Sequence, residues 1–202
     1  MPEPKVLTPR SGFAGLLDST GPSSAPGVRV SEPADLQIAT VIARQGRRDG
    51  LAAPLRAAYG VELPSGPKRV ASDRLALLGT GPRTWLALRT GGAPLALELA
   101  HELGKTAAVV DQSDGYAVLR LTGEKLRATF EKGLAVDLHP RAFGPGDVAV
   151  TTCAHLGVIV WQLDEAPTYE VAVFRSLAAS FWHWLSESAA EFGLGAIPAG
   201  RG

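Results

Sequence analysis

The sequence lacks several features that mark familiar classes of protein. Its 202 residues contain one cysteine, Cys153, which excludes a disulfide framework within the chain and favours a reducing compartment. Twenty Lys and Arg balance twenty Asp and Glu, so the basic surplus that nucleic-acid binding usually needs is missing. No run of about 18 apolar residues occurs, so no transmembrane helix is expected. The N-terminus also lacks the apolar core of a secretory signal, so we expect a cytoplasmic protein.

Glycine is frequent, but its spacing does not match a phosphate-binding loop. The segments GTGPR and RTGGAP lack both the spacing of a P-loop and that of a dinucleotide-binding turn. A nucleotide-binding fold is therefore unsupported.

The composition predicts one folded domain with an N-terminal extension. An apolar content of 46% over this length can supply a substantial core. Residues 1–34 are rich in Pro, Gly and Ser and predict an extended arm. Residues 35–195 predict a single α+β domain of two pseudo-repeated modules, and residues 196–202 a flexible tail.

An apolar cluster interrupts the arm at SGFAGLL, which carries Phe13, Leu16 and Leu17. Two alternatives remain open for it. The arm is a disordered tail with a chance apolar patch, or it docks and buries these side chains on a partner or on its own domain.

The hydrophobic patterns predict alternating strands and helices. Strands are expected at residues 36–43, 74–79, 83–89, 106–112, 116–121, 147–155, 157–163 and 168–174. Helices are expected at residues 47–60, 93–104, 124–133 and 176–193, the last two starting from Thr122 and Ser176. The strands at 106–112 and 116–121 are expected to form a hairpin around SDG. Adjacent hairpins favour mixed or antiparallel sheets with packed helices over a doubly wound sheet. The strand-to-helix passages at 86–104 and 171–193 suggest a weak internal repeat.

Reactive-looking residues gather between Val136 and His155. Cys153 and His155 form a C-x-H pair on a predicted strand, and His139 lies nearby. Zinc requires three or four well-placed ligands, and this spacing does not supply them. A Cys–His nucleophile pair would need a base held by a third group, which is not evident. We therefore expect Cys153 to pack as a small apolar side chain, and we assign no catalytic, cofactor-binding or metal-binding residue.

Some side chains are candidates for contact with a partner. Pro140 makes HPRAF a rigid turn that presents Arg141 and Phe143, either to a partner or as a solvated arginine over a buried ring. In the last helix, Trp182 points away from the main apolar stripe and is expected to be partly exposed or at a subunit contact. The candidate contact residues are Phe13, Leu16, Leu17, Arg141, Phe143 and Trp182.

The segments DLHPRAF, LGVIVWQ and SLAASFWHWL resemble the gamma subunits of heterotetrameric sarcosine oxidases, and RSGFAGL resembles the opening of that family. The resemblance implies a structural subunit without a cofactor, in an enzyme that demethylates sarcosine. It also implies alpha, beta and delta subunits as partners. FAD, FMN, NAD, tetrahydrofolate and zinc are expected on those partners.

A more remote resemblance is to the folate-binding fold of the aminomethyltransferases (glycine cleavage T-proteins). The order of VVDQS, YAVLRLTG, EKLRATFEKG and FGPGDVAVTT is similar to theirs. Those enzymes carry an acidic pair after a glycine that opens the next strand, whereas Val158 and Ile159 follow Gly157 here. The resemblance therefore implies a catalytically silent copy of the fold. The alternatives are a free-standing folate-binding or one-carbon transfer protein, and a relative that serves iron–sulfur maintenance through a reactive cysteine.

Overall fold

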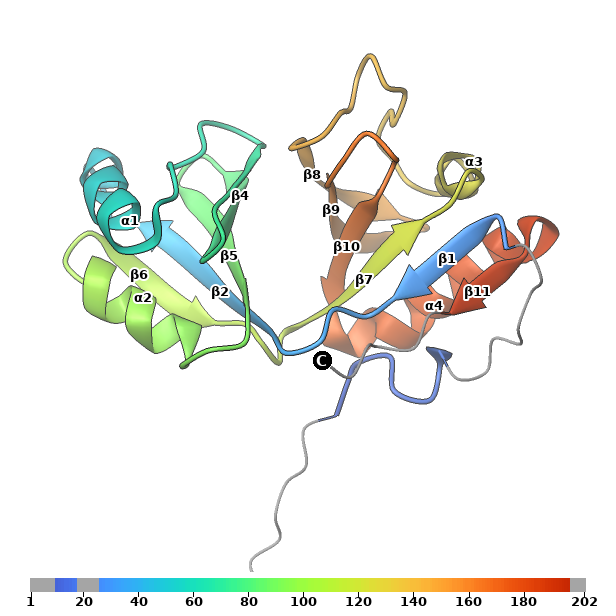
Figure 1. Ribbon diagram of the computed structural model, residues 1–202, viewed down its shortest axis with the longest axis horizontal. Helices are drawn as coiled ribbons and strands as arrows, with labels where there is room; N and C mark the ends of the chain where they lie inside the picture. Colours follow the sequence, from blue (N-terminus) through green and yellow to red (C-terminus); the bar gives the residue numbers. More distant parts are fainter. Residues whose placement is uncertain (1–9, 18–25, 197–202) are drawn as a thin grey trace, which may run out of the picture.

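The computed structural model describes residues 10–17 and 26–196, which form two facing β-sheets (Figure 1). The six-stranded sheet contains, in spatial order, β11 (Leu194–Ala196), β1 (Val28–Ser31), β7 (Tyr116–Thr122), β10 (Tyr169–Phe174), β9 (Leu156–Gln162) and β8 (Val148–Cys153). The five-stranded sheet contains β3 (Arg69–Ala71), β4 (Ala76–Gly81), β5 (Thr84–Thr90), β2 (Leu36–Ala43) and β6 (Ala107–Asp111). All pairings are antiparallel except β1 with β11, so the expectation of mixed or antiparallel sheets is confirmed.

Helices cover the outer face of each sheet. The helices are α1 (Ala52–Tyr59), α2 (Leu95–Leu103), α3 (Leu126–Phe130) and α4 (Ala178–Ala189), with 3-10 turns at Arg48–Leu51, Arg175–Leu177 and Ala190–Phe192. The helices α1 and α2 pack on the five-stranded sheet, and α3 and α4 pack on the six-stranded sheet (Figure 1). Successive side chains of a strand point to opposite faces, so Val41 of β2 contacts the helices while Ile38 faces the other sheet. The result is a stack of helices, sheet, sheet and helices.

The two inner faces meet in a shared apolar cluster. Its buried members are Ile38, Leu78, Leu86 and Leu88 of the five-stranded sheet, and Val118, Val148, Ile159, Trp161 and Ala172 of the six-stranded sheet. Backbone hydrogen bonds add a direct seam between the sheets, from Arg69 N to Gly146 O at 2.7 Å and from Val148 N to Pro67 O at 3.0 Å. An ion pair between Lys68 and Asp147 lies beside this seam. The sheets are therefore held together by side chains and by backbone.

The two halves of the chain repeat one pattern. The order β3-β4-β5-β2-β6 in one sheet corresponds to β8-β9-β10-β7-β1 in the other, with β11 added at the edge. The passages β5 to α2 and β10 to α4 occupy matching places in the two halves. These are the two passages in which the sequence suggests an internal repeat.

The predicted hairpin at 106–121 is wrong. The strand β6 belongs to the five-stranded sheet and β7 to the six-stranded sheet, so residues 112–115 form a crossing rather than a tight turn. Gln112 N donates to Ile38 O at 2.8 Å and Ile38 N donates to Ser113 Oγ at 3.1 Å. These bonds lay the crossing against the start of β2, where residues 32–35 make the return connection (Figure 1). Local periodicity predicts the strands but does not report which sheet each one joins.

The predicted domain boundaries also need correction. Val28–Ser31, placed in the arm, form β1 and pair with β7 on one side and with β11 on the other. Ala196, placed in the tail, is the last residue of β11. Residues 1–9 and 18–25 of the predicted arm, and 197–202 of the predicted tail, lie outside the described residues.

The predicted starts of the last two helices are displaced. Thr122 is the last residue of β7, and α3 begins at Leu126. Between them, Gly123 has a φ of 124°, and a Cβ there would lie 2.2 Å from the carbonyl oxygen of Gly27. This close approach to the start of β1 requires a glycine and separates the strand from the helix. Ser176 lies in the 3-10 turn that precedes α4 and makes no capping bond for that helix.

Phe13 fastens the described part of the arm to the domain itself. Its side chain is 1% exposed and belongs to the core between the six-stranded sheet and α4. Phe13 N donates to Ser11 Oγ at 2.8 Å, and Leu16 N donates to Phe13 O at 2.9 Å. Of the alternatives for the arm, docking on its own domain is confirmed for this residue.

Replacing Phe13 by alanine should destabilise the isolated chain by about 3–5 kcal/mol, because a fully buried ring is lost and a cavity remains. Urea unfolding followed by tryptophan fluorescence measures the change. Arg10→Ala is the control, because Arg10 is exposed and contributes its backbone carbonyl to the neighbouring contact. Equal stability of the Phe13→Ala variant and the wild type would contradict the packing of this segment.

Candidate functional site in the groove between the sheets

An apolar groove of about 220 Å3 opens at one end of the contact between the sheets. The five-stranded sheet contributes Thr40, Thr80, Thr84 and Leu86. The six-stranded sheet contributes Tyr116, Val150, Thr151, Gly157, Val158, Ile159 and Phe174. The groove is thus lined by aliphatic and aromatic groups with a few hydroxyls, and by no ionisable carboxyl, amine or imidazole group.

Two apolar side chains of this groove are open to solvent. Val150 is 60% exposed and Phe174 is 49% exposed, although both belong to strands. The ring of Phe174 stacks on Tyr116, its cross-strand partner, with centroids 5.0 Å apart and an angle of 18° between the planes. The Thr151 hydroxyl is already engaged, since it donates to Ala135 O at 2.9 Å. The groove can therefore accept an apolar side chain and offers little to a charged ligand.

The segment Gly157–Val158–Ile159 lies at this groove. Ile159 is 6% exposed and faces the other sheet, whereas Val158 is 3% exposed and packs into the core on the opposite face. The resemblance to the aminomethyltransferases places an acidic pair here. In this chain both positions line the groove with branched alkyl groups, which cannot accept a proton or bind an amine.

Cys153 and His155 do not form a pair. Cys153 is fully buried, and this burial raises the pKa of its thiol to about 12. Ala154 and His155 make the turn between β8 and β9 with φ values of 46° and 71°, so the exposed His155 lies beyond the strand. The expectation that both residues lie on one strand is therefore wrong, because β8 ends at Cys153 and His155 lies in the turn. Among residues 10–17 and 26–196, no three His, Cys, Asp or Glu side chains gather where they could hold a metal ion.

The HPRAF segment is a hydrogen-bonded turn. His139 N donates to Asp137 Oδ1 at 2.8 Å, and Phe143 N donates to His139 O at 2.9 Å. The side chain of Phe143 is 5% exposed and stacks on Tyr169, with centroids 6.3 Å apart. Arg141 is exposed. The ring of Phe143 is therefore buried, as one of the two alternatives has it, and the contact of Arg141 with a partner stays a prediction.

The candidate partner contacts divide into two groups. Phe13, Phe143 and Trp182 are buried in the domain's own core, so the expectation that they face a partner is wrong; Trp182 is 6% exposed. Leu16 and Leu17 are partly buried. They and Arg141 stay predictions. Helical spacing misjudges Trp182 because the core around α4 includes residues of other elements besides the sheet and so covers more than one stripe of the helix.

Sequence reasoning missed the exposed side chains Val150 and Phe174. Their strands read as ordinary core strands, since VAV and VAVF are continuous apolar runs. The missing information is that β8 is an edge strand and that both side chains line an open groove between the sheets. A sequence pattern alone does not contain either fact.

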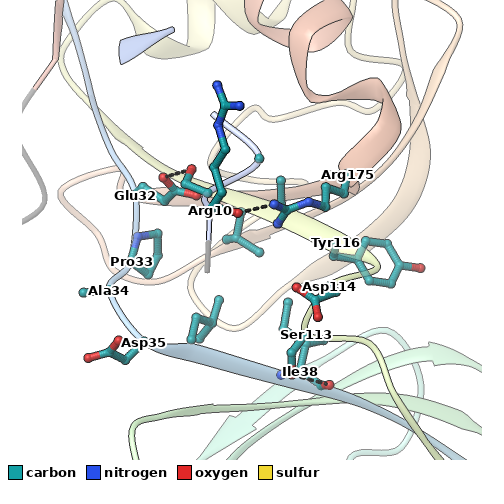
Figure 2. A pocket seen from close by; sticks show the side chains of 15 residues that line it. Arg10, Glu32, Pro33, Ala34, Asp35, Ile38, Ser113, Asp114, Tyr116 and Arg175 are labelled. Carbon is teal, nitrogen blue, oxygen red and sulfur yellow. Dashed lines mark hydrogen bonds between the residues drawn. The ribbon is translucent and has the colours of Figure 1, made fainter. Parts of the chain in front are cut away.

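A second cavity, of about 420 Å3, lies where the N-terminal segment meets the two connections between the sheets (Figure 2). Figure 2 shows the guanidinium of Arg175 reaching the backbone carbonyl of Arg10. The hydroxyl of Ser11 also donates to the carboxylate of Glu32. These contacts are between the protein's own groups. They hold the N-terminal segment to the domain.

Residues 45–191 match the family described as "Sarcosine oxidase, gamma subunit family". The chain belongs to this family. It is 36% identical over 143 residues to the sarcosine oxidase subunit gamma of Corynebacterium sp. (strain P-1), a match that covers 69% of this chain and 70% of that one. It is also 36% identical over 144 residues to the subunit gamma of Arthrobacter sp., again covering 69% and 70%. The family inferred from DLHPRAF, LGVIVWQ and SLAASFWHWL is thereby confirmed.

Solved structures extend the match to the whole fold of this gamma-family chain. A chain of the heterotetrameric sarcosine oxidase from Corynebacterium sp. U-96, in complex with pyrrole 2-carboxylate, is similar with a TM-score of 0.81 and 27% identity. That match covers 91% of this chain and 96% of the other. The glycine cleavage system aminomethyltransferase T from Bartonella henselae is similar in fold, with a TM-score of 0.59, 11% identity and coverage of 88% and 49%. The aminomethyltransferase-like fold is confirmed. In the described part of this chain, no helix is long and apolar enough to cross a membrane.

The buried thiol predicts a stability that falls at high pH. The unfolded chain releases the Cys153 proton above about pH 8.5, whereas the folded chain keeps it up to a pKa of about 12. The folded state then holds the extra proton, so the thiol's contribution is complete below about pH 8.5 and is lost as the pH rises toward 12. Urea midpoints at pH 7, 8.5 and 10 should fall more steeply for wild type than for Cys153→Ala. Rapid alkylation of the native chain by iodoacetamide at pH 8 would contradict the burial.

Proposed function

We propose that this chain is the structural gamma subunit of a heterotetrameric sarcosine oxidase. The observation that carries the proposal is the likeness to a chain of such an enzyme over nearly the full length of both chains. The family match over residues 45–191 agrees with it. An oxidase for another N-methylated amine would use the same gamma-type chain, and in the test below it would co-elute with flavin but form no peroxide from sarcosine.

The proposal places the chemistry on the other subunits. Alpha, beta and delta subunits would carry FAD, FMN, NAD, tetrahydrofolate and zinc, in a cytoplasmic complex that converts sarcosine to glycine. Two features of this chain support a non-catalytic role. The thiol of Cys153 is protonated at neutral pH and enclosed by the core, so it is a poor nucleophile. The groove presents Ile159 where the folate enzymes are acidic.

The groove between the sheets is the surface that we assign to a partner subunit. Val150 and Phe174 expose apolar area on strands, where an uncovered apolar patch marks a contact site. A monomer gains nothing from leaving them in water, whereas a subunit of a tetramer covers such side chains on assembly. The occupant expected from the lining is an apolar side chain of another oxidase subunit. Leu16, Leu17 and Arg141 remain proposed contacts outside the groove.

The proposed function is tested by affinity capture of the tagged full chain from its native cells. Flavin absorbance and sarcosine-dependent peroxide formation are then measured in the eluate. Co-elution of three further chains with flavin and activity is the expected result. Elution of the chain alone, without colour or activity, would overturn the subunit role. Tetrahydrofolate binding by the isolated chain would then support a free-standing folate protein.

Replacing Val150 by glutamate should weaken assembly, because a carboxylate in a covered apolar groove loses its hydration without gaining a partner. We expect at least a roughly tenfold loss of co-purified subunits, with an unchanged melting temperature of the isolated chain. Leu97→Glu is the matched control, since Leu97 is 70% exposed on α2 and lies outside the groove. Equal yields of co-purified subunits from the two variants would show that the groove is not part of the interface.

A further inference from the structure

The opposite end of the contact between the sheets holds charged side chains instead of apolar ones. Arg120 of β7 and Glu170 of β10 are cross-strand partners, and the guanidinium donates to Glu170 Oε1 from Nη2 at 2.7 Å and from Nε at 3.0 Å. The indole Nε1 of Trp161 donates to the other oxygen, Oε2, at 2.8 Å. Both oxygens of Glu170 are therefore engaged. Its side chain is only 9% exposed, whereas that of Arg120 is 48% exposed.

Arg69 lies near this pair from the other sheet. It is opposite Leu78 in the pairing of β3 with β4, and Leu78 belongs to the cluster between the sheets, so Arg69 points to the same side. Its Nε is buried and has no hydrogen-bond partner, and no side-chain bond to Arg69 occurs within residues 10–17 and 26–196. Burial lowers the pKa of its guanidinium, Glu170 acts against that shift, and Arg120 adds to it. An arginine nevertheless keeps its charge at neutral pH.

A cavity of about 210 Å3 lies among these groups. Its ionisable lining is Arg69, Arg74, Arg89, Arg120, Asp73 and Glu170. Arg89 is neutralised elsewhere, by Glu98 at 2.5 Å, and Asp73 and Arg74 are exposed. At the inner wall, Glu170 is paired with Arg120, and Arg69 has no ion-pair partner among the described residues, which leaves one positive charge without a counter-charge.

We propose that this cavity, between Arg69 and the Arg120–Glu170 pair, binds a carboxylate group. A carboxylate carries the one negative charge that the inner wall lacks, and its two oxygens match the planar fork of a guanidinium. The cavity is smaller than the about 300–1,000 Å3 of pockets that hold drug-sized ligands, so it fits the charged end of a molecule. The carboxylate comes from a free acid or from an acidic residue or C-terminus of another oxidase subunit. The partner-subunit source rests on the proposed function, whereas acetate binding by the isolated chain does not depend on it.

The first test uses the isolated full chain and acetate as the probe. Acetate titration at constant ionic strength, followed by isothermal calorimetry and by melting temperature, should show one saturable site in the wild type. Arg69→Gln should weaken acetate binding by about tenfold or more, as expected for a lost charge-assisted hydrogen bond. Arg69→Lys should retain part of the binding, because it keeps the charge and loses the fork. Glu170→Gln should tighten binding, because it removes the competing carboxylate and can still accept from Trp161.

Arg83→Gln is the matched control, since Arg83 is an exposed arginine outside the cavity. Unchanged acetate binding in Arg69→Gln, tighter binding of phosphate than of acetate in the wild type, or no saturable binding of acetate would overturn the proposal. An effect of Glu170→Gln opposite in sign to that expected would also overturn it. If Arg69→Gln does not fold, the Arg69→Lys and Glu170→Gln variants still test the proposal, through the expected partial loss and the expected gain of acetate binding.

The assembled oxidase then separates the two sources of the carboxylate. Acetate binding that persists in the tetramer, and is weakened in the tetramer containing Arg69→Lys, indicates a free acid as the natural ligand. Loss of acetate binding on assembly, together with weaker assembly of Arg69→Lys, indicates a carboxylate supplied by a partner subunit. Neither readout uses the groove variant Val150→Glu. A result against the carboxylate site can therefore be told apart from a result against the groove as a partner contact.

Discussion

The contact between the two inner sheet faces is the constraint on which the rest of this structure depends. Each sheet already buries its outer face under helices, so the inner faces are stable in water only against one another. Burial of apolar surface contributes roughly 25 cal/mol per Å2, and the fully buried Trp161 lies in this contact. The groove and the charged cavity are the two ends at which the contact stops.

Those two ends differ because β7 and β10 carry an apolar cross-strand pair at one end and a charged cross-strand pair at the other. Along β7 and β10, Tyr116 and Phe174 form the row at the groove, and Arg120 and Glu170 form the row at the cavity. The same pair of strands thus presents an apolar surface at one end and an ionic surface at the other. This polarity suits a subunit whose two ends meet different surroundings. It also explains how a fold shared with aminomethyltransferases can carry no carboxylate at Ile159 and still keep its architecture.

Much of the fold was predictable from periodicity, because an element leaves its pattern within a few residues. The helices at 93–104 and 176–193 and all eight expected strands need only short-range information, and the HPRAF turn follows from Pro140. The hairpin at 106–121 failed because the choice between two sheets depends on the distant Ile38. The exposure of Trp182 was misjudged for the same reason, since the elements that cover it are remote in sequence. Val150 and Phe174 could not be found at all without knowing where the facing sheet ends.

The sequence by itself determined the family, the alternation of strands and helices, the mixed sheets and the apolar pair after Gly157. These properties are local, because residue type and spacing express them directly. Only the tertiary structure decided that Phe13 packs on its own domain and that His155 lies in a turn beyond the strand that holds Cys153. It also decided that Arg69 lines the same cavity as Arg120 and Glu170. Each of these depends on contacts between segments 50 or more residues apart or on the shape of a turn, which side-chain chemistry along the chain does not specify.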